Sequence, residues 1–227
     1  MRLISLLCLG SMLVSFHSYS QTDGNFKYSI AAKGFSIIQL PKVFNQDYER
    51  FLNTRLQGGM IKFNENQMSY RLSGNYTENN LNFGNNCMNC DLTTGRMKDY
   101  AFKIGFEKSL NYACIQPYFA LDLGYRFNQF LGIVNTLNNQ RNSIAVHSLR
   151  ETKIGYTISP GCGVKINPIP QLSIYIESGI EYFYANVRQD LTAQDVSAVK
   201  TKIRFNRAEF LLNPISIGIQ LHLGNKN

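Results

Sequence analysis

Apolar and polar residues alternate along most of this chain, and the alternation is clearest over residues 100–127. On both sides of a break at Asn111 and Tyr112, every second position carries a large apolar side chain, as at Phe102 and Phe119. The positions between them carry charged residues and glycine. A repeat of two is that of a β-strand, whose successive side chains point to opposite faces of a sheet. The segment therefore predicts two antiparallel strands joined by a short turn.

The same alternation recurs in other parts of the chain. Residues 153–184 predict a second hairpin with its turn at Asn167–Pro170, and residues 54–76 predict a third. A last strand covers residues 215–223, and a first strand lies within residues 26–40. The count is eight strands, most of them about ten residues or longer, which is the length that crosses a bilayer at a tilt.

The predicted connections form two classes. They are short turns at 64–67, 111–113 and 167–171, and long polar stretches at 41–53, 77–98, 128–150 and 189–203. Outer-membrane barrels have short periplasmic turns and long outside loops. We therefore expect an all-β fold, an eight-stranded antiparallel transmembrane β-barrel with long extracellular loops and short periplasmic turns. Apolar residues at helical spacing after Pro41, from Phe44 to Leu56, leave a short helix and a continuous strand both open there.

Alternation alone leaves open which face of the strands is inside, because a soluble lipocalin-like barrel shows it too. Glycine favours the membrane barrel. The polar face carries Gly105, Gly124, Gly155, Gly161, Gly163, Gly179 and Gly218. In water these glycines would weaken the strands for no gain, whereas inside a narrow barrel they make room for long charged side chains.

Residues 1–20 have the composition of a secretory signal peptide. Arg2 supplies the charged start, an apolar stretch follows, and Ser18–Ser20 supplies a small-x-small cleavage site. Removal after Ser20 leaves residues 21–227 as one barrel domain. A lipoprotein signal that uses Cys8 is the rival interpretation, but Cys8 lies close to Arg2 and follows bulky leucines. No later uncharged run approaches the roughly 18 apolar residues that a spanning helix requires.

The last strand resembles the signal by which the barrel assembly machinery recognises outer-membrane proteins. The resemblance is carried by Ser216, Gly218, Leu221 and Leu223. Leucines replace the favoured aromatic residues, and four residues follow the final apolar one. Gly105–Lys108 and Pro117–Arg126 look like the small outer-membrane β-barrel proteins common in Bacteroidetes. This likeness covers most of residues 54–223, and it implies a fold and an outer-membrane location but no activity.

Charged residues of both signs fall on the predicted lumen face. They are Arg71, Lys103, Glu107, Asp122, Arg126, Lys153, Glu177 and Glu181. Counting from the turns places Lys103 nearly opposite Asp122, and it places Arg71 and Glu107 at similar depth on neighbouring strands. Two interpretations stay open: a gate or selectivity filter, and a set of ion pairs that fills the lumen. The second is favoured because unpaired charges in a narrow interior are costly and eight strands leave little space.

Cys87 and Cys90 lie in the second long stretch, and export would place them in an oxidising compartment. A disulfide that braces the loop is the first expectation, and a reduced pair or a metal or redox site are the alternatives. There is no second Cys-x-x-Cys pair, so we predict no metal site and no cofactor. His147 and His222 belong to no nucleophile motif, and we predict no enzymatic activity.

The formal charge of +8 is scattered along the chain, which makes nucleic acid a poor partner and leaves contact with lipid phosphates open. We expect an outer-membrane integral β-barrel that acts as a non-enzymatic structural or surface-presentation scaffold through its outside loops. Its partners would be outer-membrane lipid, the barrel assembly machinery during insertion, and an extracellular ligand or protein. The alternatives are a narrow porin-like channel for ions or small solutes, and a component of an outer-membrane secretion or assembly complex.

Overall fold

The computed structural model describes residues 26–44, 46, 49–84, 91–111, 114–137, 143–194 and 199–225. The predicted signal peptide and the pair Cys87 and Cys90 lie outside the described residues. Within those ranges the chain forms eight strands: β1 (Phe26–Leu40), β2 (Arg50–Glu65), β3 (Met68–Gly84), β4 (Asp91–Ser109), β5 (Ile115–Leu137), β6 (Ser143–Ile169), β7 (Leu172–Ala193) and β8 (Lys200–Asn225).

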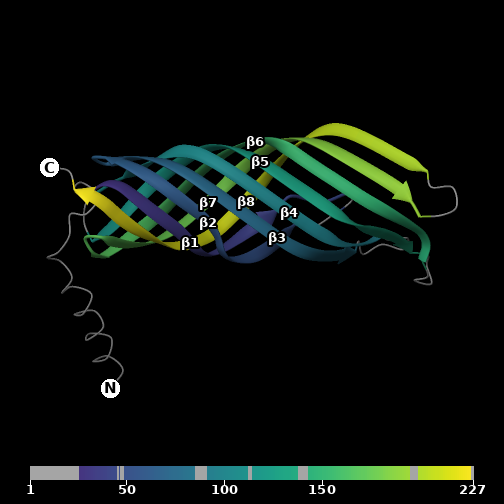
Figure 1. The fold of residues 1–227 in the computed structure, drawn as a ribbon, viewed down its shortest axis with the longest axis horizontal. Helices are drawn as coiled ribbons and strands as arrows, with labels where there is room; N and C mark the ends of the chain where they lie inside the picture. Colours follow the sequence, from purple (N-terminus) through teal and green to yellow (C-terminus); the bar gives the residue numbers. More distant parts are fainter. Residues whose placement is uncertain are drawn as a thin grey trace, which may run out of the picture.

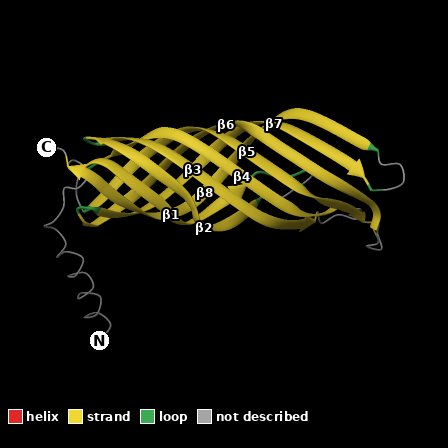
Figure 2. Ribbon diagram, in the orientation of Figure 1, coloured by secondary structure: helices red, strands yellow, loops and turns green. Residues whose placement is uncertain are grey.

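The strands form a closed antiparallel ring in which each strand pairs with its neighbours in sequence and β1 closes on β8 (Figure 1). Every labelled element is a strand (Figure 2). The predicted eight-stranded antiparallel barrel is therefore confirmed, and its first strand lies at the predicted residues 26–40. Among the described residues, no helix has the length and apolar character needed to cross a membrane.

Side-chain exposure settles which face is inside. The apolar residues of the hairpin over 100–127 point outward, with Phe102 54% and Phe119 59% exposed, whereas Lys103 and Asp122 on the other face are buried. Aromatic rings also meet in rows on the outer surface. Tyr76, Tyr100 and Phe127 form one such row across β3, β4 and β5, and Tyr28, Phe63 and Tyr70 form another nearer the short turns. The outer surface is thus an apolar band with aromatic rows.

The expectation of long loops is wrong, because the strands continue through most of the predicted loop residues. The ladder between β5 and β6 runs without interruption from Ile115↔Ile166 as far as Thr136↔Ala145. The connections at this end shrink to residues 41–49, 85–90, 138–142 and 194–199. The error arose because the two faces are mixed in polarity in this outer part. Several apolar residues there, such as Phe130 and Leu149, point inward, and polar residues such as Asn80 and Arg150 are exposed, so the segments looked like polar loops.

The inward apolar residues form a core inside the outer part of the barrel. Its buried members are Leu40, Val43, Leu81, Phe83, Met97, Phe130, Val134 and Leu149. Val43 belongs to the connection between β1 and β2 and is fully buried, so the described start of this connection lies inside the barrel. We call its described residues 41–44 the plug segment. The helix considered for residues 41–56 does not form among the described residues, because the pair Leu40↔Arg50 and the next pairs extend the strand ladder instead.

One seam of the ring is shorter than the others. The ladder between β2 and β3 begins at Glu65↔Met68 and ends at Gly58↔Asn75. Each strand stays paired with its other neighbour for longer: β3 with β4 up to Gly84↔Leu92, and β2 with β1 up to Leu40↔Arg50. Beyond Gly58 and Asn75, the described residues of β2 and β3 therefore run without pairing to each other.

The charged interior of the barrel

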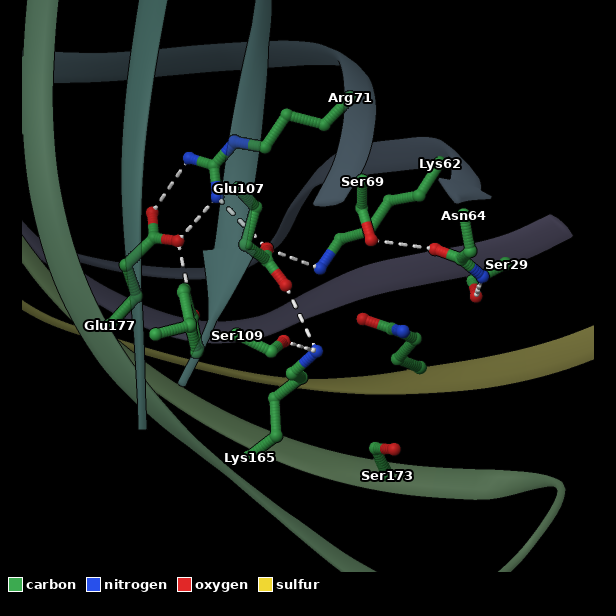
Figure 3. A network of polar contacts seen from close by, with 12 residues as sticks. Ser29, Lys62, Asn64, Ser69, Arg71, Glu107, Ser109, Lys165, Ser173 and Glu177 are labelled. Atoms are coloured by element: carbon green, nitrogen blue, oxygen red, sulfur yellow. Dashed lines mark hydrogen bonds and ion pairs between the residues drawn. The ribbon is translucent and has the colours of Figure 1, made fainter. Parts of the chain in front are cut away.

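Glu107 of β4 is the centre of an inner cluster of charges near the short turns (Figure 3). Its Oε2 lies 2.6 Å from the ammonium of Lys62 on β2, and its Oε1 lies 3.0 Å from that of Lys165 on β6. A guanidinium nitrogen of Arg71 is 3.4 Å from Oε2. All of these side chains are buried. Three cations around one buried carboxylate compensate the desolvation that an isolated ion would suffer.

Arg71 of β3 links this cluster to two further carboxylates. Its Nε and Nη2 donate to the two oxygens of Asp122, at 2.7 and 2.5 Å. Its Nη1 and Nη2 also donate to Glu177, at 2.7 and 3.2 Å. The planar guanidinium suits such paired contacts with carboxylates. Because β3 and β7 are not neighbours in the ring, the contact with Glu177 crosses the lumen.

A second cluster lies further toward the outer part of the barrel. Arg126 of β5 donates to both oxygens of Asp99, at 2.9 and 2.8 Å, and it also binds Glu181 of β7. Lys103 of β4 binds the same Glu181 and donates to Ser159 at 2.9 Å. This cluster also spans the lumen, since both cations reach from β4 and β5 to β7.

Lys103 and Asp122 lie diagonally across the β4–β5 pair, close to the predicted positions, but they form no ion pair with each other. Lys103 faces Gly124 across the strand pair, and Asp122 faces Gly105, two positions away. Asp122 binds Arg71 instead, and Lys103 binds Glu181. Arg71 and Glu107 do contact each other, as their predicted depth in the barrel suggested.

Glycine has a definite role at position 105. Gly105 lies between Arg71 on one neighbouring strand and Asp122 on the other. A Cβ atom at this position would lie 2.2 Å from Oδ1 of Asp122. The absent side chain thus lets the guanidinium and the carboxylate meet over the glycine.

A third group of charges holds the plug segment. Lys153 of β6 lies 2.5 Å from Glu209 and 3.7 Å from Glu151, and its ammonium also donates to the backbone oxygen of Lys42. The backbone N–H of Lys42 donates to Glu209 at 3.1 Å, and that of Phe44 donates to Glu151 at 2.9 Å. Phe44 has a positive φ of 46°, which a non-glycine residue adopts at a cost. These contacts fix the inward fold of the segment.

Near the short turns, His222 lies between two serines. Its Nδ1 is 3.0 Å from Ser29 Oγ and its Nε2 is 2.6 Å from Ser173 Oγ. Asn64 donates to Ser29, and Ser173 donates to Asn167. His222 is 2% exposed, so the group is part of the polar filling of the barrel. No metal-binding group of three or more His, Cys, Asp or Glu residues occurs in the described part of the chain.

The structure places all eight predicted lumen charges inside the barrel, in the three groups just described. Sequence reasoning missed other charged residues that point inward, among them Lys33, Lys62, Asp99, Glu151, Lys165 and Glu209. Extending the alternation by one or two steps would have found Asp99 beside Tyr100 and Lys165 beyond Gly163. Of the four residues in the assembly signal, Ser216 is buried, while Leu221 and Leu223 are about half exposed on the apolar band.

The space left by these side chains is small. A cavity of about 90 Å³ lies between the first two charge clusters, lined by residues such as Arg71, Lys103, Asp122 and Glu181. At about 30 Å³ for each water, it has room for roughly three water molecules. The arrangement can therefore hold water or a small polar group, and its ion pairs cross the lumen on both sides of it.

No protein-family model matches this chain, and no curated protein sequence does. Its fold is similar to that of the outer membrane protein OprG from Pseudomonas aeruginosa, with a TM-score of 0.50 and 12% identity over 89% of this chain and 100% of that one. Weaker similarities are to a major outer membrane protein from Thermus thermophilus (TM-score 0.45, 14% identity, 88% and 98% covered). Another is to Ail, the attachment invasion locus protein of Yersinia pestis (0.41, 14%, 86% and 98%). At such identities the similarity to OprG establishes the fold alone.

Proposed function

We propose that this protein is an outer-membrane β-barrel with a closed lumen that acts as a non-enzymatic scaffold. The outward apolar band with its aromatic rows supports a place in lipid, because such girdles mark both edges of a membrane barrel. The fold shared with the outer membrane protein OprG agrees with this location. Export by residues 1–20, insertion by the barrel assembly machinery and kinship with the barrels of Bacteroidetes remain predictions.

The observation that carries the closed lumen is the contact of Arg71 with Glu177, at 2.7 Å across the barrel. Arg71 is held by Asp122 at the same time, and a second crossing by Lys103 and Arg126 lies further out. Breaking buried ion pairs to let an ion through would leave charges without partners, at a cost of about 3–5 kcal/mol for each pair. Further out, Val43 of the plug segment packs inside the barrel in the apolar core.

Because the strands extend through most of the predicted loop residues, recognition of an outside partner would use the outer part of the barrel. There the strand ladders extend beyond the aromatic row of Tyr76, Tyr100 and Phe127. Exposed cations lie on the outer surface of this part, including Arg96, Arg150, Arg188, Lys202 and Arg204. A rigid wall of this kind positions recognition residues more firmly than a free loop. Its positive charge suits phosphate-bearing surface lipid or an anionic partner outside the cell.

Single-channel conductance of the refolded protein tests this proposal. A heat-dependent gel shift first confirms that the barrel is folded and inserted. We expect no discrete current steps from verified barrels. Steps would overturn the closed lumen and establish the alternative, a narrow channel for ions or small solutes, with the charge clusters as its selectivity filter.

A further inference from the structure

The seam between β2 and β3 joins two hollows on opposite sides of the barrel wall. Beyond Gly58 and Asn75 the two strands part, so the wall lacks the backbone hydrogen bonds that seal its other seams. Leu56, two residues before Gly58, has a positive φ of 49° and is 80% exposed. This bulge on β2 lies opposite the register shift of β1 at Lys33 and turns the strand away from β3.

On the outer side of the seam lies a groove of about 710 Å³. Its floor is made by glycines, since Gly58, Gly59 and Gly74 offer no side chains there. Its walls are mainly apolar and aromatic, made by Leu56, Tyr76, Tyr100, Phe102, Tyr125 and Phe127, with the carboxylate of Glu78 as the one charged group among the described lining residues. The volume falls within the roughly 300–1,000 Å³ typical of ligand sites, and the lining suits a hydrocarbon chain.

On the inner side lies the cavity of about 90 Å³ between the charge clusters. Gln57, Asn75 and Ala101 line both the cavity and the groove, so the two hollows meet at the seam. Asn75 stands at the junction. Its Oδ1 occupies the space of the missing side chain of Gly58, only 2.1 Å from where a Cβ would be.

The cavity offers hydrogen bonds but no excess charge. Its described lining contains four cations, Lys33, Arg71, Lys103 and Arg126, and four carboxylates, Asp99, Asp122, Glu177 and Glu181. No described residue forms an ion pair or a hydrogen bond with the ammonium of Lys33. Its charged neighbours are Glu177, Asp122, Lys103 and Arg71. The buried Oε1 of Gln57 likewise has no hydrogen-bond partner among the described residues.

We propose that the seam binds a single-chain amphiphile with a small, neutral, hydroxyl-bearing headgroup, such as a monoacylglycerol or a fatty alcohol. The chain lies in the groove, and the headgroup enters the cavity beside Asn75. There a hydroxyl oxygen accepts from Lys33, and a hydroxyl group donates to Gln57. A charged headgroup is disfavoured because it would unbalance a set of buried ions. This inference goes beyond the proposed function and uses only the lipid-facing orientation of the wall.

Native mass spectrometry of the folded protein released from detergent micelles tests the site. Monolauroylglycerol, lauric acid and dodecylamine are offered at equal concentration, with the heat-dependent gel shift as a check of folding. We expect a one-to-one adduct with monolauroylglycerol, at least tenfold more abundant than that with either charged amphiphile. Equal adducts for the three compounds, or preference for the acid or the amine, would overturn the assignment of the headgroup.

Two variants locate the binding. Gly74→Leu fills the groove, and a Cβ at position 74 meets no atom within 4 Å, so the barrel should fold. We expect the adduct to become at least tenfold less abundant. Ala32→Leu places a leucine at an exposed position outside the groove and should keep the adduct. Lys33→Met should reduce the preference for the glycerol headgroup. Full binding by Gly74→Leu would overturn the site. None of these results depends on whether the lumen conducts.

Discussion

The carboxylate of Asp122 occupies the space that a side chain at position 105 would fill, because Gly105 is its partner across the β4–β5 ladder. Arg71 faces the same glycine from β3 and reaches over it to both oxygens of Asp122. One missing side chain thus permits the ion pair that begins the crossing of the lumen. This relationship makes the glycine as necessary to the charge network as the charged residues themselves.

Substitution of Gly105 should destabilise the barrel. In Gly105→Ala the new methyl group would also lie 2.2 Å from the backbone oxygen of Leu121, which cannot move aside easily. We expect the free energy of unfolding to fall by about 1–3 kcal/mol, as for other overpacked interiors. Urea titration followed by the gel shift measures it. Gly74→Ala is the control, since its Cβ meets open space, and an equal loss in both variants would refute this role of Gly105.

Removal of Arg71 should lower the free energy of unfolding by more than removal of an exposed cation does. Arg71→Met leaves Asp122 and Glu177 in the interior without their shared partner, and breaking such a buried pair costs about 3–5 kcal/mol. Urea unfolding of the variant measures this cost. Arg96→Met is the control, because Arg96 is 60% exposed and water screens its pair with Glu78. A loss no larger than that of the control would show that the crossing contributes little to stability.

The plug segment should be released when its anchor is removed. Val43→Cys, in a background whose native cysteines are serine, should resist a water-soluble thiol reagent because Val43 is fully buried. Adding Lys153→Met removes the ammonium that binds Lys42 and Glu209, and labelling at position 43 should then become at least tenfold faster. Lys202→Cys, at an exposed position of the outer wall, should react quickly in both backgrounds. Continued protection of position 43 in folded barrels would mean that the apolar core alone holds the segment.

The outer ladders should protect backbone amides from hydrogen exchange. Residues 128–137 and 143–153 are polar enough to resemble loops, yet they pair with each other along β5 and β6. Their amides should exchange slowly in the folded protein, within about tenfold of residues 115–127 on the same β5 strand, because strand hydrogen bonds must open first. Exchange within seconds over 128–153 would instead support the long loop that the sequence predicted.

Sequence patterns were sufficient for the inner part of the barrel. Alternation over 100–127 predicted both strands of the hairpin and the correct inward face, since lipid-facing and lumen-facing positions must differ at a period of two. The same reasoning failed over 128–150. There apolar Phe130, Val134 and Leu149 point inward while Leu131 and Ile133 point outward, so hydrophobicity no longer distinguished the two faces of the strand.

The sequence by itself determined the number of strands, their order and the inward position of eight charged residues, because these follow from local alternation and short turns. Only the tertiary structure decided which acid binds which base. Arg71 and Glu177 are 106 residues apart and meet because ring closure places β3 across from β7. Tertiary structure also decided where β2 and β3 part, since a register shift and a positive φ at Leu56 leave no mark on the hydrophobic pattern. The partners of long flexible side chains and the points where ladders end depend on how the whole ring closes, and no local sequence repeat encodes that closure.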